Sequence, residues 1–446
     1  MPQEFIALLM FSSMLMLMMT GQRVFAVIGV VAVVASLALW GTGGQAMGFS
    51  ASMKLMRWYP MLTLPMFVFM GYIMSESRMA EDLYKMLHVW FGPIPGGLAL
   101  GTLLLMVLIS AMNGLSVAGM AIGATIALPE LLRRGYDKRM ISGVIQAGSS
   151  LGILLPPSVV LVLYAMIART SVTDLWLAGI MPGLMMAAIF FIYVALRCLL
   201  QPELGPPVPK AERESVTWGQ KFKLLREGAL PFIIFFAMMY PVVKGYAGLV
   251  ESSVIGVAMT LIAATVRGRM TWTVLETALR RTLGISCMFM WIILAALSFG
   301  AVFDGLGAVK TVERIFVQDM GLGPWAILIL MQLTFLIMGM FLDDTAMLVI
   351  VAPLYVPLVA TLDLGLPKDQ VLIWYGVLYT ITCQIAYLTP PFGYNLFLMR
   401  AFAPRDLTMG DIYRSASPFV GLMLLALGLV MAFPQIALWL PAVLKG

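Results

Sequence analysis

The sequence AGSSLGILLPPS at residues 147–158 places two consecutive prolines inside an apolar run, and LTPPFGYNLF at residues 388–397 does so again near the other end of the chain. A proline has no amide donor and its ring collides with the preceding helical turn, so a helix must break at each pair. The breaks free backbone carbonyls at residues 152–155 and 387–389. Such carbonyls, together with nearby side-chain oxygens, suit a small hard cation such as sodium. We therefore expect two broken helices that each contribute to a cation site.

The composition around these motifs is that of a membrane protein. Of the 446 residues, 61% are hydrophobic and only 11% are charged, and the mean hydropathy is +0.97. Soluble domains carry about 45–50% apolar and about 25% charged residues, which excludes a large soluble protein. The apolar runs that we expect in the membrane cover residues 3–20, 24–40, 58–75, 96–132, 140–167, 176–199, 229–243, 247–266, 283–302, 324–361, 371–402 and 417–438.

Two of these runs are about twice as long as one membrane crossing requires. Each has polar residues near its middle, at 113–116 and at 343–345, and each precedes a run broken by Pro-Pro. Such a run predicts a helical hairpin that enters and leaves the membrane on the same side, with its tip lining a site. Because these features recur in the same order, an internal repeat is predicted. The predicted parts are a first repeat at 1–200 with its hairpin at 96–132 and broken helix at 140–167, a cytoplasmic linker at 201–228, and a second repeat at 229–446 with its hairpin at 324–361 and broken helix at 371–402.

The basic residues predict how the repeats are oriented. If the linker is cytoplasmic and both hairpins are re-entrant, 20 of the 28 Lys and Arg residues lie inside and 8 outside, as the positive-inside rule requires. Five crossings per half then give the halves opposite orientations. The predicted fold is an all-α polytopic membrane protein with two inverted repeats, as in secondary transporters, with its site near the bilayer midplane.

Other classes of function have little support. The three cysteines show no paired spacing, a single histidine excludes a histidine-based metal cluster, and no P-loop or basic nucleic-acid patch is present. Asp343 and Asp344 are adjacent carboxylates deep in an apolar run. A membrane aspartyl protease needs one aspartate on each of two facing helices, so neighbours in sequence do not suit it. We expect no enzyme activity, with Asp344 in a cation site and Asp343 as its neighbour or a helix cap. The alternative is that both aspartates are simply solvated in a wet vestibule.

The same stretches resemble a known family. The segments GYD at 135–137, AGSSLGILLPPS at 147–158, GMFLDDT at 339–345 and LTPPFGYNLF at 388–397 resemble the large membrane subunit of the tripartite ATP-independent periplasmic (TRAP) transporters. This resemblance implies a sodium-driven elevator in the bacterial inner membrane that imports an organic acid anion. It also implies two partners, a periplasmic solute-binding protein and a small four-helix membrane subunit. The alternative is a stand-alone sodium- or proton-coupled anion carrier of the same architecture that needs no binding protein.

The resemblance also assigns site residues. At the first hairpin tip, many members of the family have a run of small hydroxyl residues where this chain has Asn-Gly-Leu-Ser at 113–116. The implied sodium ligands are Asn113, Ser116, Gly152, Leu155 and Pro157 in the first half, and Asp344, Thr345, Thr389, Pro391 and Gly393 in the second. The candidates for contact with the solute are Ser158, Asn395 and Arg400.

Overall fold

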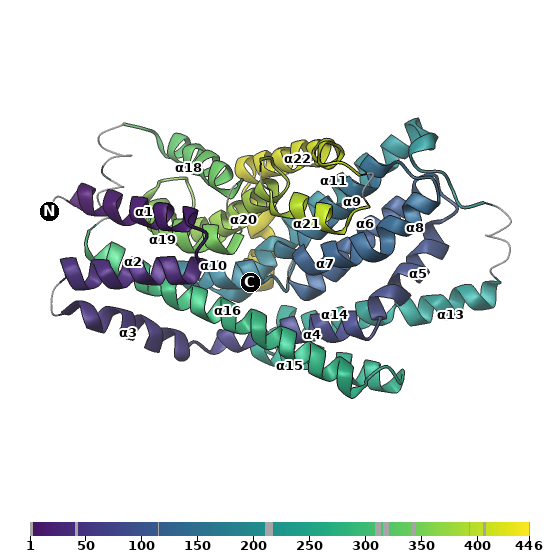
Figure 1. Cartoon of the computed structure of the whole chain (residues 1–446), viewed down its shortest axis with the longest axis horizontal. Coiled ribbons are helices and arrows are strands. Elements are labelled where there is room, and N and C mark those ends of the chain that lie inside the picture. Colours follow the sequence, from purple (N-terminus) through teal and green to yellow (C-terminus); the bar gives the residue numbers. More distant parts are fainter. Residues whose placement is uncertain are drawn as a thin grey trace.

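The computed structural model describes residues 3–40, 43–114, 116–209, 217–307, 314, 321–340, 344–391, 393–404 and 407–445, and the regular structure in these residues is entirely helical. The helices form an elongated bundle (Figure 1). In the described part of the chain, four helices are long and apolar enough to cross a membrane, namely α11, α15, α16 and α22. At about 1.5 Å rise per residue, the 34 residues of α16 span roughly 51 Å.

The first half of the chain contains the following elements: α1 (Gln3–Met19), α2 (Val24–Leu39), α3 (Gly44–Met56), η2 (Tyr59–Leu62), α4 (Thr63–Glu76), α5 (Met79–Phe91), α6 (Gly97–Asn113), α7 (Ser116–Ile122), the π-helical turn η3 (Gly123–Ala127), α8 (Leu128–Arg133), α9 (Lys138–Ser150), η4 (Leu151–Ile153), α10 (Val159–Ala168), α11 (Val172–Leu200) and η5 (Pro202–Leu204).

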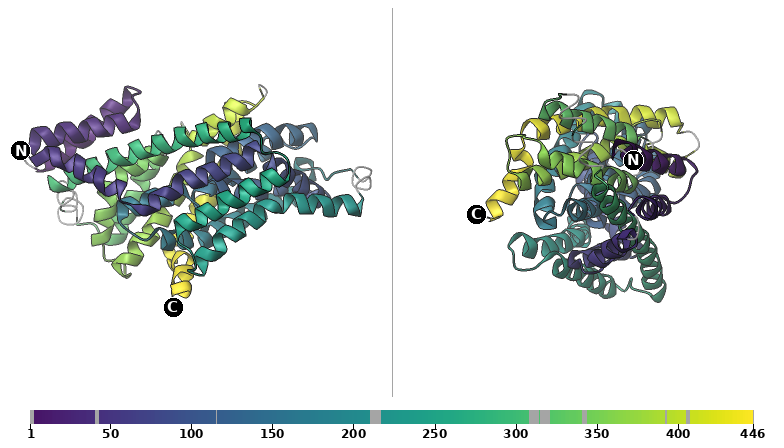
Figure 2. Two further views of the ribbon diagram at one scale, coloured as in Figure 1. Left: turned by 90° about the horizontal axis from the view of Figure 1, so that it is seen from below. Right: turned by 90° about the vertical axis from the view of Figure 1, so that its left-hand side faces the viewer.

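The second half contains α13 (Trp218–Gly228), α14 (Leu230–Val243), α15 (Leu249–Val266), α16 (Trp272–Gly305), α18 (Pro324–Gly339), α19 (Asp344–Thr361), α20 (Lys368–Tyr387), α21 (Tyr394–Phe402), α22 (Met409–Ala432) and α23 (Gln435–Lys445). α23 projects from the side of the bundle in both views of Figure 2.

The helices differ from the predicted apolar runs in several places. α3 and α5 lie outside all of the runs, because α3 is only moderately apolar and α5 is amphipathic. α13 lies inside the predicted linker, where Thr217 and Gln220 form a reciprocal capping box at its start. The predicted run 417–438 is two helices, because Pro434 disfavours helical backbone at Phe433, which takes φ −126° and ψ 78°.

The packing separates two sets of helices. In the first set, α2, α3 and α4 pack on the long helix α16, and α15 packs on α4. The second set comprises α6, α7, α9, α10, α11 and α18 to α22, which pack on one another through α9, α11 and α20. Each set draws helices from both halves of the chain. The two sets meet where α4 packs on α6 and where α16 packs on α19.

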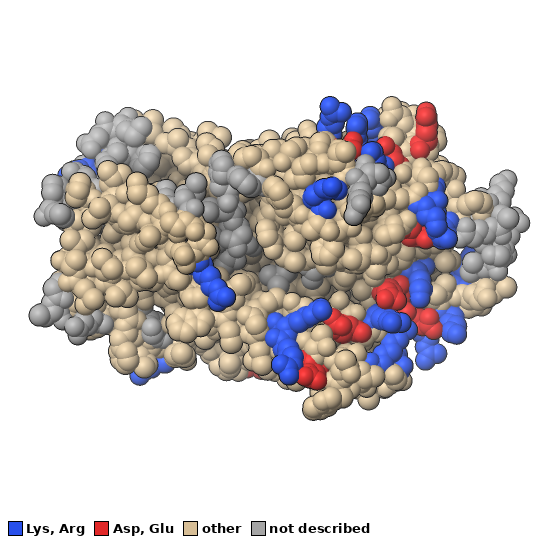
Figure 3. Space-filling view, in the orientation of Figure 1, with Lys and Arg blue, Asp and Glu red and all other residues tan. Residues whose placement is uncertain are grey.

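Charged side chains gather at one end of the molecule, around α5, α8 and the turn between α15 and α16 (Figure 3). Asp82 on α5 is buried and pairs with Arg267 at 2.7 Å and with Arg269 at 2.6 Å. Two guanidinium groups on one carboxylate satisfy a charge that would be costly to bury alone. This cluster fixes α5 to the turn between two helices of the second half.

A second ion-pair cluster fixes α9 to α22. Lys138 and Arg139, at the start of α9, each approach the carboxylate of Asp411 to 2.9 Å. The hydroxyl of Thr408 also donates to this carboxylate, at 2.8 Å. The three donors together satisfy a charge that is buried between the two helix ends.

Candidate functional site

The first break in the second helix set separates α9 from α10. η4 follows α9 directly, and residues 154–158 are non-helical before α10 begins at Val159. The peptide bond between Pro156 and Pro157 is cis. Every residue from 151 to 160 is buried, including the predicted ligands Gly152 and Leu155. Non-helical backbone at this depth is covered by protein, as a membrane interior requires.

The first hairpin, α6 with α7 and α8, ends against this break. Gly114 caps α6 with a left-handed backbone at φ +66°. A Cβ at this position would lie 2.3 Å from the carbonyl oxygen of Pro157, so only glycine fits both the turn and the contact. The Gly114 carbonyl accepts a hydrogen bond from the Val159 amide at 3.3 Å.

The second break separates α20 from α21 and is more open to solvent. The peptide bond between Pro390 and Pro391 is also cis, and both of these prolines are exposed. Thr389 donates its hydroxyl to the carbonyl of Ile385 at 2.6 Å. The Pro391 carbonyl accepts a hydrogen bond from the hydroxyl of Tyr413 on α22 at 3.0 Å. Two of the predicted ligands therefore have protein partners in this arrangement.

The second hairpin, α18 with α19, contacts the second break as the first hairpin contacts the first. Met340 caps α18, and its carbonyl accepts a hydrogen bond from the Gly393 amide at 3.4 Å. In both halves, the carbonyl of the residue that caps the first hairpin arm bonds to the amide two residues after the second proline. Gly393 also has a left-handed backbone, with φ +43°.

The backbone of Asp344 and Thr345 lies at the start of the second arm of this hairpin. Asp344 is the first residue of α19, and Thr345 is the second. Asp343 lies outside the described residues, and the side chains of Asp344 and Thr345 do so as well. The helix dipole favours a carboxylate at such an N-terminus.

Residues of the two halves meet between α7 and α21. Asn395 donates its side-chain amide to the hydroxyl of Ser116 at 2.9 Å, and that hydroxyl lies 3.2 Å from the amide oxygen of Asn395. Both side chains are buried. A predicted sodium ligand and a predicted solute contact are therefore brought together across 279 residues of sequence.

Asn113 lies on the boundary between the two helix sets. A Cβ on Gly71 of α4 would lie 1.7 Å from its side-chain oxygen. The carboxamide of this predicted ligand therefore packs directly on α4, at a point where α4 has no side chain.

Ser110 on α6 is a functional candidate that the sequence motifs do not include. Ser110 packs directly on two glycines of the site region. A Cβ on Gly119 would lie 1.9 Å from the hydroxyl oxygen of Ser110, and a Cβ on Gly152 would lie 2.6 Å from the carbonyl oxygen of Ser110. The hydroxyl is buried and has no hydrogen-bond partner among the described residues. A buried hydroxyl left without a partner costs about 1–3 kcal/mol. The signal in the sequence is its spacing, because a residue three positions before Asn113 lies on the same helix face.

Two predicted solute contacts have other partners. The hydroxyl of Ser158 accepts a hydrogen bond from the Leu161 amide and donates to the carbonyl of Ile153, so it caps α10 from a fully buried position. Arg400 is exposed and donates to the carbonyl of Leu407 at 2.9 Å.

The chemistry of the donors suits a hard monovalent cation. The candidates at the first break offer hydroxyl, carboxamide and carbonyl oxygens. Within the residues that the structure describes, no group of three or more His, Cys, Asp or Glu side chains could hold a metal ion. Oxygen ligands of this kind suit a hard cation such as sodium.

An all-helical membrane bundle with two broken helices, each meeting the end of a hairpin, has the architecture of a multi-pass membrane transporter. The family model for the DctM component of the tripartite ATP-independent periplasmic transporters matches residues 9–436. The chain belongs to this family.

Similar proteins agree with this assignment. The chain is 28% identical over 383 residues to the C4-dicarboxylate TRAP transporter large permease protein DctM of Pseudomonas aeruginosa, with 86% of each chain covered. It is 28% identical over 389 residues to the ectoine TRAP transporter large permease protein TeaC of Halomonas elongata, covering 85% of this chain and 86% of that one. The crystal structure of the Alcanivorax borkumensis YdaH transporter has the same overall fold, with a TM-score of 0.62, 15% identity and coverage of 90% and 91%.

Proposed function

We propose that this chain imports an organic acid anion, driven by a sodium gradient, as the large subunit of a three-part transporter in the bacterial inner membrane. A periplasmic solute-binding protein delivers the anion, and a small four-helix subunit accompanies this chain in the membrane. Relatives are named for a C4-dicarboxylate and for ectoine, both of which carry a carboxylate. The observation that carries the proposal is the matching hydrogen bond at the two breaks, from Val159 to Gly114 and from Gly393 to Met340.

The matching bonds support two inverted repeats, at 1–200 and 229–446, whose broken helices contribute to two sodium sites. In the first site, the ligands that we propose are Asn113, Ser116 and the carbonyls of the break, with Ser110 added. In the second, they are Asp344, Thr345 and the carbonyls that follow Thr389. We assign Ser158 to the capping of α10 and not to the solute.

The separate packing of the two helix sets supports an elevator mechanism. The second helix set holds both breaks and both hairpins, whereas the first set is built around α16. In this mechanism the second set slides along the first and carries the sodium sites and the solute with it. The contact between Asn113 and the bare backbone at Gly71 suits such sliding, because no side chain on α4 has to be displaced there.

Uptake into proteoliposomes tests the proposed function. With the small subunit and the loaded binding protein present, an inward sodium gradient should drive uptake without ATP. Full-rate uptake in sodium-free buffer with only a proton gradient would overturn the assignment of sodium. Full-rate uptake of free solute without any binding protein would favour the stand-alone carrier.

Labelling from the two sides of the membrane tests the inverted topology. We expect cysteines that replace Arg133 and Lys368 to react with an impermeant thiol reagent from opposite sides, Arg133→Cys from the cytoplasm and Lys368→Cys from outside. Arg133 is 74% exposed and Lys368 is exposed, so both sites are accessible. The background replaces Cys198, Cys287 and Cys383. Reaction of both positions from one side would remove the inverted repeat.

A further inference from the structure

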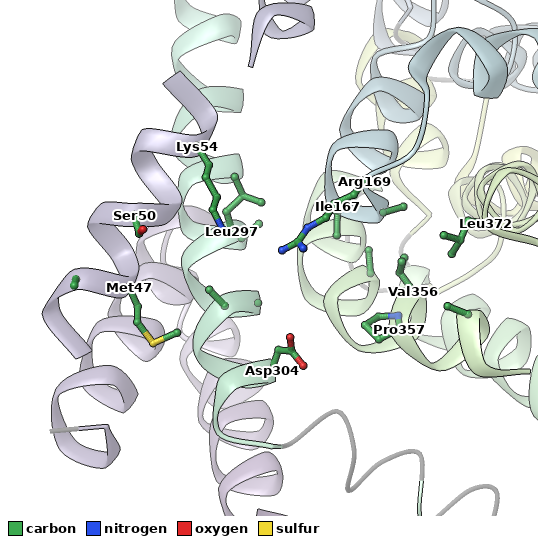
Figure 4. Close-up of a pocket in the computed structure, with 17 residues that line it drawn as sticks. Met47, Ser50, Lys54, Ile167, Arg169, Leu297, Asp304, Val356, Pro357 and Leu372 are labelled. Carbon is green, nitrogen blue, oxygen red and sulfur yellow. The ribbon is translucent and has the colours of Figure 1, made fainter. Parts of the chain in front are cut away.

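A cavity of about 550 Å³ lies where the two helix sets face each other. α3 and α16 of the first set form one wall, and α10, α19 and the start of α20 form the other (Figure 4). None of the predicted sodium or solute residues lines this cavity. Its volume is within the range of about 300–1,000 Å³ that is usual for small-molecule sites.

Three charged residues face into this cavity from different helices. Lys54 is on the last turn of α3, Arg169 caps the end of α10, and Asp304 is on the last turn of α16. In Figure 4, Lys54 extends toward Leu297 and the guanidinium of Arg169 points across the cavity toward α16. The carboxylate of Asp304 faces the same space. Among the described residues that line the cavity, the charges of these three side chains sum to +1.

Arg169 is held at the end of α10, where it lines the cavity. Arg169 has a left-handed conformation with φ +52°, which is uncommon for residues other than glycine. It closes α10 by donating its amide to the carbonyl of Ala165. Arg169 also lines a neighbouring cavity of about 420 Å³ with Asp174 and Asp369, but its guanidinium points away from α10 toward α16 (Figure 4).

Apart from Ser50, the remaining lining is apolar and mostly small. It includes Ala46, Ala296, Gly300, Ala301, Ala352 and Ala360. Small residues leave room for a solute, and an apolar wall strengthens the field of the charges that it surrounds. A carboxylate is the ligand that two converging cations of this kind recognise.

We propose that this cavity is a carboxylate-binding subsite for the transported solute. This proposal rests on the proposed function, because it takes the cargo to be an organic acid. One carboxylate binds between Lys54 and Arg169, and Asp304 selects against a second anionic group beside it. Because Lys54 belongs to the first helix set and Arg169 to the second, sliding of the second set moves Arg169, with the bound carboxylate, away from Lys54.

A reporter thiol measures the charge of the cavity without requiring transport. Ser50 lines the cavity and is exposed, so Ser50→Cys is introduced with Cys198, Cys287 and Cys383 replaced, in complex with the small subunit. Its reaction rates with an anionic sulfonate and a cationic trimethylammonium methanethiosulfonate are compared. A unit charge about 10 Å away in water changes the local concentration of each reagent about twofold, so removing one cation should lower the rate ratio about fourfold.

We expect Lys54→Gln and Arg169→Asn each to lower the ratio of sulfonate to trimethylammonium rates by about this factor. Asp304→Asn should raise it. Asparagine is chosen at 169 because it tolerates the left-handed backbone. Lys244→Gln is the matched control, since it removes the same charge at an exposed position that does not line the cavity. A ratio that responds equally to Lys244→Gln and Lys54→Gln would overturn the proposal.

Protection by a probe anion tests binding directly. Propionate, which carries one carboxylate, should slow the reaction of the Ser50→Cys thiol, whereas propionamide, its uncharged analogue, should not at the same concentration, with ionic strength held constant by chloride. Lys54→Gln should abolish the protection by propionate, and Asp304→Asn should strengthen it. Equal effects of propionate and propionamide would exclude a carboxylate subsite. These readouts do not depend on sodium, so they stand apart from the uptake experiment that tests the proposed function.

Discussion

Ser110→Ala should raise the sodium concentration for half-maximal uptake about tenfold, because the loss of one oxygen ligand worth about 1.4 kcal/mol changes an affinity by that factor. The same change should leave the thermal stability equal or slightly higher. The hydroxyl is buried without a partner in the described part of the chain, so its removal relieves a desolvation cost and breaks no hydrogen bond in the protein.

The comparison that isolates the hydroxyl is Thr102→Val. Thr102 is on the same helix and equally buried, but its hydroxyl already donates to the carbonyl of Leu98 at 2.8 Å. Thr102→Val should therefore leave the sodium concentration for half-maximal uptake unchanged. Uptake as a function of sodium concentration and thermal melting of the purified complex are the two measurements. A loss of stability in Ser110→Ala with no change in sodium dependence would identify Ser110 as a structural residue.

The pattern of opposite outcomes distinguishes a ligand from a packing residue. A residue that only packs loses stability when it is truncated, whereas a ligand held in an unsatisfied state loses function and keeps stability. Asp344→Ala is the corresponding change in the second half. It should raise the sodium concentration for half-maximal uptake by at least as much as Ser110→Ala does, since the proposed ligand there is a carboxylate with a full charge.

The membrane class and the two breaks could be predicted from the sequence because their causes are local. Composition excludes a soluble fold regardless of tertiary structure, and Pro-Pro breaks a helix wherever it occurs. The lengths of the apolar runs were informative for the same reason. Hydropathy did not predict α3, which is only moderately apolar, or α13, which is amphipathic. Such helices are stabilised by the surfaces on which they pack.

The contacts within the site could not be predicted because they join distant parts of the chain. Nothing near Ser116 indicates that Asn395 is its partner, and nothing near Asn113 indicates that it packs on Gly71. The cavity with Lys54, Arg169 and Asp304 is similar, since each residue lies at a helix end without a motif. The sequence likewise does not indicate that Arg400, which lies near a motif, donates to the carbonyl of Leu407.

Gly114→Ala should abolish transport and destabilise the protein by about 2–5 kcal/mol. The left-handed backbone at φ +66° costs an alanine about 1–2 kcal/mol. The added Cβ would also lie 2.3 Å from the carbonyl oxygen of Pro157, and overpacking of this kind costs about 1–3 kcal/mol. Because that oxygen belongs to backbone, relief requires the hairpin end and the break to move apart, which removes the bond between Gly114 and Val159.

Gly135→Ala separates strain from collision. Gly135 also has a left-handed backbone, at φ +79°, but no atom lies within 4 Å of the position that a Cβ would occupy. Gly135→Ala should lose only the roughly 1–2 kcal/mol of stability that the left-handed backbone costs an alanine, and it should keep its transport activity.

Gly393→Ala should resemble Gly114→Ala, since its Cβ would lie 2.9 Å from the carbonyl oxygens of Thr389 and Tyr387. Melting temperature and sodium-driven uptake of the three variants are the measurements. If Gly114→Ala keeps its transport activity as Gly135→Ala does, the contact between hairpin and break is dispensable, and the matching hydrogen bonds of the two halves have no part in transport. If Gly114→Ala and Gly393→Ala both fail while Gly135→Ala works, the two breaks act as one kind of element, used once in each half of the chain.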